Sequence, residues 1–469
     1  MNAGGSSASG DRRFLAPWAL LPDGWRSDVV MTVDAGGSIA AVEARRETDR
    51  TASLHVLPGP VVPAMADVHT HSFQRLLAGR MQTTPATGED DFWSWRQGMY
   101  RLANRIAPES LTVIAAFVYS ELLAAGYTRI GEFHYLHRGA DGAAGTGREM
   151  GEALLHAAGA TGVALTLLPA LYQYGGFGQR PASSDQQRFL LALDEYLELH
   201  AALGARAAAC GQPAPGVAVH SLRAVDPMTA AELRRALPAL PFHLHIAEQP
   251  AEVEACIAQY GITPIRLALD RLDLDAHCCL VHATHGMGDE LAAVAACGAV
   301  VALCPGTEAD LGDGLFPLAD FLAQGGRFAL GSDSNATLSP FTEVQRLEHQ
   351  ARLVARRRHR LAPPGGIHSG TWLWQHAAQA GAHALGAAGG IAAGRPADWL
   401  VLKPLTVLAE TLPVEHWLDA AILGEALVAI DEVYAGGVRR VAGGRHLEAE
   451  RYGEALRAVL KDNPGMFNE

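Results

Sequence analysis

The chain has 469 residues, of which 49% are hydrophobic and 19% are charged. This balance is typical of a folded enzyme with a sizeable core and argues against a disordered protein. The formal net charge is −13, so we expect no general attraction to nucleic acid or to anionic lipid.

The N-terminus predicts neither a signal peptide nor an anchor. Residues 1–10 are rich in Gly, Ser and Ala and lack an apolar core, so we expect a flexible tail there. No run of about 18 uninterrupted apolar residues appears, and we predict no membrane span. The six cysteines form no CxxC pair, which favours buried free thiols in a reducing compartment. We therefore expect a cytoplasmic protein.

Both ends of the chain predict β-structure. Segments such as "VVMTVDAGGSIAAVE" near the N-terminus and "VYAGGVRRVAGGRHLE" near the C-terminus combine alternating residues with Gly-rich turns. Because chain termini often lie close together, the two ends can pair into one domain. We predict that 11–60 and 386–469 form a small β-sandwich domain.

Between these ends, apolar runs alternate with helical stretches rich in Ala, Leu, Glu and Arg. Eight such strand–helix units predict a (β/α)8 TIM-type barrel, α/β in class, over 61–385. The eight runs are VVPAMADVHTH ending at His71, GYTRIGEFHYL at Leu136, GVALTLLPALY at Tyr172, GVAVHSLRAV at Val225, PFHLHIAEQ at Gln249, CCLVHATH at His285, AVVALCPGTE at Glu308 and RFALGSDSN at Asn335.

The reactive side chains come last in these runs. The carboxyl ends of barrel strands build the active site, so residues from several strands should converge there. His69 and His71 lie on the same side of a strand because side chains repeat every two residues. With His245 and Asp333 they predict a zinc site of three imidazoles and one carboxylate.

Two further features of the sequence indicate which histidine of β-strand spacing binds the metal and how many metal ions bind. His243 has the same two-residue spacing from His245, and we assign the metal to His245 and leave His243 as a packing or supporting residue. Lysine occurs only at Lys403 and Lys461. A carbamylated lysine therefore cannot bridge two metals within the predicted barrel, which favours a single zinc ion per chain.

The whole pattern resembles the amidohydrolase superfamily, in its one-metal deaminase branch. The motifs "HTHSFQR" (69–75), "FWSWRQGMY" (92–100), "GEFHYLH" (131–137), "HSLRAV" (220–225), "HLHIAEQ" (243–249) and "CPGTEADLGDG" (304–314) resemble the formimidoylglutamate deiminases of histidine degradation. These enzymes convert N-formimidoyl-L-glutamate and water to N-formyl-L-glutamate and ammonia. The resemblance covers most of the chain.

The resemblance implies a role for each matched residue. His69, His71, His245 and Asp333 would bind zinc, while Glu248, His282 and Asp333 would act as catalytic residues. A zinc-bound water has a pKa of about 7, and acid–base groups beside it move protons to and from the reacting atoms. The residues implied for contact with a small anionic substrate are Gln74, Arg96, Tyr135, His220 and Arg223.

Several alternatives remain open at this point. Glu248 could cap the following helix, His282 could be a core histidine, and Arg223 could pair with Asp226 on the surface. The chain could also be another one-metal deaminase acting on a nucleobase, or a scaffold that kept the barrel and lost the chemistry, although the ligand set is complete. Barrels of this kind are often homodimers, and we expect a homodimer here.

Overall fold

The computed structural model describes residues 11–49, 53–84, 91–139, 147–424 and 426–467. The tail predicted at 1–10 lies outside the described residues.

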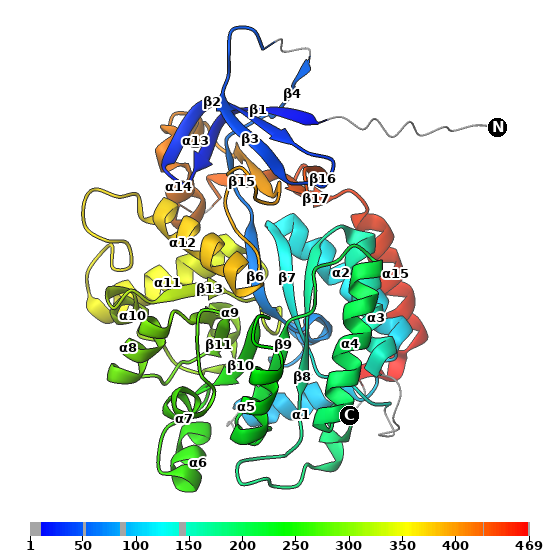
Figure 1. Ribbon diagram of the computed structural model, residues 1–469. Helices are drawn as coiled ribbons and strands as arrows, with labels where there is room; N and C mark the ends of the chain where they lie inside the picture. The colour runs from blue at the N-terminus through cyan, green and yellow to red at the C-terminus, as the bar shows by residue number, and fades with distance from the viewer. Residues whose placement is uncertain (1–10, 50–52, 85–90, 140–146, 425, 468–469) are drawn as a thin grey trace, which may run out of the picture.

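Eight parallel strands close into a barrel in the order β10-β11-β12-β13-β6-β7-β8-β9, and helices surround it (Figure 1). Each predicted run contains one of these strands, which confirms the predicted TIM-type barrel. The strands are β6 (Met65–Thr70), β7 (Tyr127–His134), β8 (Ala164–Leu171), β9 (Val217–Ser221), β10 (Phe242–Ile246), β11 (Cys278–His282), β12 (Val300–Leu303) and β13 (Arg327–Leu330).

The barrel strands are covered on both faces, which explains their almost uninterrupted apolar sequences. β12 reads VVAL and β11 reads CCLVH, and every residue of both strands is buried. One face of such a strand fills the barrel interior and the other packs against the surrounding helices.

The helices begin at residues suited to a first turn. α5 starts at Pro227, and the Asp226 side chain accepts the backbone N–H of Met228. The helices are α1 (Phe92–Ala103), α2 (Pro108–Ala125), α3 (Gly147–Thr161), α4 (Leu193–Ala209), α5 (Pro227–Ala236), α6 (Pro250–Tyr260), α7 (Pro264–Arg271), α8 (Gly288–Cys297), α9 (Pro305–Leu311), α10 (Leu318–Ala323), α11 (Pro340–Ala355), α12 (Ser369–Ala384), α13 (Val407–Glu410), α14 (Trp417–Leu423) and α15 (Ala449–Asp462), with 3-10 turns η2 (Ser72–Leu77), η3 (Ser184–Phe189), η4 (Val414–His416) and η5 (Pro464–Phe467).

The two chain ends form one mixed sheet, which confirms the small β domain. Strands β5 and β14 pair antiparallel and join the N-terminal strands to the C-terminal ones. The domain boundaries at 60/61 and 385/386 stay predictions, and β5 itself pairs within this sheet before the chain enters β6. The strands are β1 (Arg12–Leu21), β2 (Gly24–Val33), β3 (Ile39–Ala44), β4 (His55–Val56), β5 (Val61–Pro63), β14 (Trp399–Pro404), β15 (Val428–Ala435), β16 (Val438–Ala442) and β17 (Arg445–His446).

Helix α2 is long and apolar enough to cross a membrane by length and composition. Half of it is buried inside the fold, where it packs against α3, α15 and η2. Core helices of globular enzymes pass the same length and composition test, so the packing explains its apolar sequence.

Candidate active site

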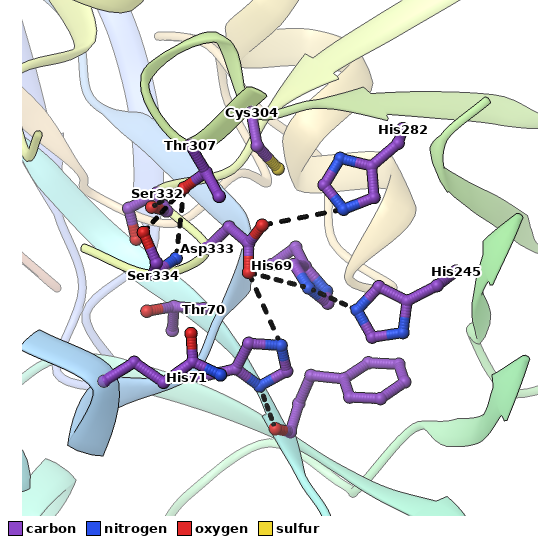
Figure 2. A network of polar contacts seen from close by, with 12 residues as sticks. His69, Thr70, His71, His245, His282, Cys304, Thr307, Ser332, Asp333 and Ser334 are labelled. Carbon is purple, nitrogen blue, oxygen red and sulfur yellow. Dashed lines mark hydrogen bonds and ion pairs between the residues drawn. The ribbon is translucent and has the colours of Figure 1, made fainter. Parts of the chain in front are cut away.

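Three histidines and one aspartate meet at the barrel mouth (Figure 2). His69 and His71 come from the end of β6, His245 from β10, and Asp333 from the segment after β13. The structure therefore brings together all four residues predicted as metal ligands, each of them at most 6% exposed.

The distances between their donor atoms suit a single ion. His69 Nε2 lies 3.0 Å from His245 Nε2. Asp333 Oδ1 lies 3.6 Å from His69 Nε2 and 3.5 Å from His71 Nε2. Donors that surround a four-coordinate zinc ion lie about 3.3 Å apart, because each is about 2.0–2.1 Å from the metal.

The hydrogen bonds of the imidazoles also fit a cation. His71 Nδ1 lies 2.8 Å from the carbonyl of Phe133, and His245 Nδ1 lies 2.8 Å from the carbonyl of His220. A carbonyl only accepts, so each Nδ1 carries the proton and each Nε2 presents a lone pair to the centre. Burial lowers the pKa of His71 and His245, and lowers that of His69 to about 3, which favours the neutral form that binds metals.

Asp333 is held in place by backbone contacts with β6. Its N–H donates to the His69 carbonyl at 2.9 Å, and its carbonyl accepts the His71 N–H at 3.0 Å. The Asn335 side chain donates to the carbonyls of His71 and Asp333. Asp333 has a φ of 48°, a left-handed conformation that costs energy for a residue other than glycine and is common at functional sites.

His282 is surrounded by carboxylates. Its Nε2 lies 3.7 Å from Glu248 Oε1 and 3.5 Å from Asp333 Oδ2, and its Nδ1 lies 3.2 Å from Glu308 Oε1. Burial alone lowers the pKa of His282, but the carboxylates, led by Glu248, outweigh burial and raise it to about 10. His282 is therefore no ordinary core histidine.

A known protein-family model matches the part of the chain that contains the histidine centre. The model, described as the amidohydrolase family, matches residues 60–426. The chain belongs to the amidohydrolase family.

Individual relatives agree with this assignment. The chain is 42% identical to formimidoylglutamate deiminase from Pseudomonas aeruginosa, over 95% of this chain and 98% of that protein. The crystal structure of an amidohydrolase from Brucella melitensis matches with a TM-score of 0.90 and 36% identity, over 96% of this chain and 99% of that one. The fold is shared more widely, because an adenosine deaminase from Xanthomonas campestris with bound zinc matches with a TM-score of 0.75 at 21% identity, over 96% of this chain and 99% of that one.

A small cavity of about 50 Å³ opens beside the histidine centre of this amidohydrolase. Its lining includes every residue predicted to contact substrate, namely Gln74, Arg96, Tyr135, His220 and Arg223. Gln74 Nε2 donates to the Tyr135 hydroxyl at 2.9 Å, and Arg96 Nε donates to the Tyr100 hydroxyl. Asp226, the alternative partner considered for Arg223, caps α5 instead.

His243 lies apart from the centre. Its ring is buried, and Nε2 lies 2.8 Å from the carbonyl of Ala384 at the end of α12. Burial lowers its pKa to about 4. The role of His243 as a packing or supporting residue stays a prediction, and this contact is compatible with it.

Sequence reasoning assigned no role to several residues at this site. Glu308, on α9, contacts His282 and also accepts the N–H of Cys304 at 2.8 Å. Tyr100 and Tyr172 line the cavity, where the Gln186 amide contacts both hydroxyls. Glu308 stands inside the "CPGTEADLGDG" motif, so the motif was the available signal, but its contact with β11 is visible only in three dimensions.

We predict that Glu308→Leu destabilises the folded protein by about 2–5 kcal/mol, because it leaves two buried N–H donors, on His282 and Cys304, without their acceptor. Glu308→Gln keeps an acceptor oxygen at this position and should cost less than about 1.5 kcal/mol. Urea unfolding followed by circular dichroism measures both. Equal losses for the two variants would show that the acceptor oxygen is unimportant.

Proposed function

We propose that this chain hydrolyses N-formimidoyl-L-glutamate to N-formyl-L-glutamate and ammonia, a step of histidine degradation. The observation that carries the proposal is a buried guanidinium nitrogen of Arg223 that lacks a hydrogen-bond acceptor in the part of the chain that the structure describes. This side chain is 9% exposed, lines the cavity next to the histidine centre, and its Nη1 has no hydrogen-bond partner among the described residues. A buried guanidinium nitrogen without a hydrogen-bond acceptor is costly and suits a substrate carboxylate. The 42% identity to formimidoylglutamate deiminase supports the same substrate.

One zinc ion would be held by His69, His71, His245 and Asp333. When bound, it would supply a nucleophile at neutral pH by lowering the pKa of a coordinated water to about 7. A single ion is expected because the sequence has no lysine between 61 and 385 that could bridge a second.

Three residues of the centre would handle the protons. Asp333, whose pKa is lowered to about 2 by its histidine neighbours against the effect of burial, is ionised and accepts a proton from the attacking water. His282, with its raised pKa, donates an N–H to the oxygen on which negative charge develops. Burial raises the pKa of Glu248, so this carboxyl can carry a proton to the leaving nitrogen, which departs as ammonia.

The remaining cavity residues would bind the glutamate part. Arg223 and Arg96 would each pair with a carboxylate, because a guanidinium can hold a carboxylate through two parallel bonds. The formimidoyl group would be oriented by Tyr135 and His220. Gln74 holds the Tyr135 hydroxyl, and His220 packs edge-on against Tyr172 with ring centroids 4.7 Å apart.

A cavity of about 50 Å³ has room for only one or two waters. Side chains such as Arg96 must therefore shift when substrate enters.

A nucleobase deaminase is the alternative function. The aromatic lining of the cavity, which includes Trp95, Tyr135, Tyr172 and Phe189, would suit a flat ring. Two arginines in the same cavity favour an anionic substrate instead. An ammonia-release screen over formimidoylglutamate, adenosine and guanine distinguishes the two functions.

We infer a cytoplasmic enzyme that acts as a homodimer, with neither a nucleic-acid partner nor a membrane partner. Sedimentation velocity on the purified protein tests the dimer.

We predict about one tightly held divalent ion per chain after gel filtration, zinc by its ligand type. His245→Ala should lose both the ion and the activity because it removes one of the three imidazoles. Mass spectrometry of the metal content and ammonia release measure the two effects. His277→Ala, at an exposed histidine just before β11, is the matched control and should change neither. An active preparation without metal would refute the prediction.

We predict that Glu248→Gln retains the metal and lowers kcat by about 10²–10⁴-fold, since an amide cannot deliver the proton. Steady-state ammonia release gives the rate. Glu254→Gln, at an exposed position on α6, should behave like wild type. Near-normal turnover in Glu248→Gln would mean that Glu248 is structural.

We predict that Arg223→Met raises KM for formimidoylglutamate by roughly 10–150-fold, because a charged hydrogen-bond partner contributes about 1.5–3 kcal/mol. The metal content should not change. Replacing a substrate carboxylate with an amide should raise KM strongly for the wild type and only slightly for the variant. Arg235→Met, at an exposed position on α5, is the control. Equal discrimination between acid and amide by both enzymes would exclude Arg223 as the carboxylate anchor.

A further inference from the structure

We propose a second metal site on the outside of the barrel, formed by His368, His416 and Asp419. These residues line a cleft of about 1020 Å³ that shares no lining residue with the cavity of the histidine centre. The cleft lies at the start of α12 and beside η4 and α14. Helices α12 and α14 pack against each other, in the upper left of Figure 1.

The three side chains already converge. One nitrogen of each histidine and one oxygen of Asp419 all lie within 4.8 Å of one another. His368 Nδ1 is 2.7 Å from Asp419 Oδ2, and the two imidazole rings meet edge-on with centroids 4.6 Å apart. An ion placed among them would need only small side-chain movements.

The backbone presents these ligands from two fixed elements. His416 and Asp419 are three residues apart, about one turn, where η4 continues into α14, so their side chains point the same way. The other oxygen of Asp419 accepts the N–H of Gly370 at 2.6 Å, which fixes the carboxylate at the start of α12. His368 is the residue directly before α12. The cluster therefore spans two helices that the fold holds together.

The donor set selects the class of ion. Two imidazole nitrogens and one carboxylate oxygen suit zinc, copper or nickel, with water completing the coordination. Ca²⁺ needs six to eight oxygen ligands, and Mg²⁺ needs an octahedral set. The same cleft is lined by Arg352, Arg358 and Arg360. Their positive charge disfavours any cation that is held by electrostatic attraction alone. The site should therefore bind transition metals and not Ca²⁺ or Mg²⁺.

Exposure makes this site weaker than the one in the barrel. His416 is exposed, and the side chains of His368 and Asp419 are 34% and 26% exposed. An ion there would join the start of α12 to the η4–α14 segment in the folded state only, so binding should raise the melting temperature as the free metal concentration rises.

The test starts from untagged holoenzyme with its one tightly bound ion. Equilibrium dialysis against Zn²⁺ and against Ni²⁺, with metal measured by mass spectrometry, should show a second, weaker equivalent. His416→Ala should lose this equivalent and the accompanying rise in melting temperature, and should retain the first ion and wild-type ammonia release. His349→Ala, at an exposed histidine of α11, should bind the second equivalent like wild type.

Three outcomes would overturn the proposal. The wild type could take up no second equivalent, His416→Ala could take it up as fully as wild type, or Mg²⁺ and Ca²⁺ could compete for it. His368→Ala gives an independent check, and it should also remove the second equivalent. Metal uptake and the rise in melting temperature do not depend on the identity of the substrate, so failure of the proposed function leaves these two readouts intact.

Discussion

The backbone contacts that close the barrel between β13 and β6 are the constraint on which the histidine centre depends. The strand ladder itself provides one paired position there, Leu330 opposite Asp67. The closure continues past the end of β13, where Asp333 exchanges two backbone hydrogen bonds with His69 and His71. The same bonds that complete the barrel therefore set the distance from Asp333 to both histidines of β6.

Polar side chains beneath this closure keep it rigid. The Asp67 carboxylate accepts the N–H and hydroxyl of Ser332, and Asn335 donates to Thr70 and to the His71 carbonyl. Burial raises the pKa of Asp67 to about 7, against the effect of these hydrogen bonds. Burying such groups is costly unless every partner is present, so the network has one stable arrangement. The large apolar core of the barrel offsets this cost.

Much of the barrel and of the metal ligand set could be predicted because strand position and side-chain period are local properties of the sequence. The two-residue period placed His69 and His71 together, but the same rule could not separate His243 from His245. His243 lies about one repeat, roughly 6.6 Å, nearer the start of β10, and there the Ala384 carbonyl at the end of α12 binds its ring. Only the packing of α12 reveals that partner.

Contacts between different strand–helix units could not be predicted from local patterns in the sequence. The pairing of Glu308 with His282 joins the unit after β12 to the end of β11. The backbone of His282 is also left-handed, with φ 68°, a conformation that no local pattern of side chains predicts. The sequence motifs pointed to candidate site residues, and the closed barrel determines which of them meet.

The arrangement of charge in the cavity also explains how an acidic protein could select an anion. Arg96 Nε donates to the Tyr100 hydroxyl, and the Arg223 guanidinium carbon Cζ lies 6.0 Å from the centroid of the Trp93 ring. Both contacts are weaker than a bidentate bond to a carboxylate. A dianionic substrate would replace them with stronger bonds, whereas a neutral ring would bury the Arg223 guanidinium further without pairing it. Specificity would thus come as much from the penalty on neutral ligands as from attraction to the anion.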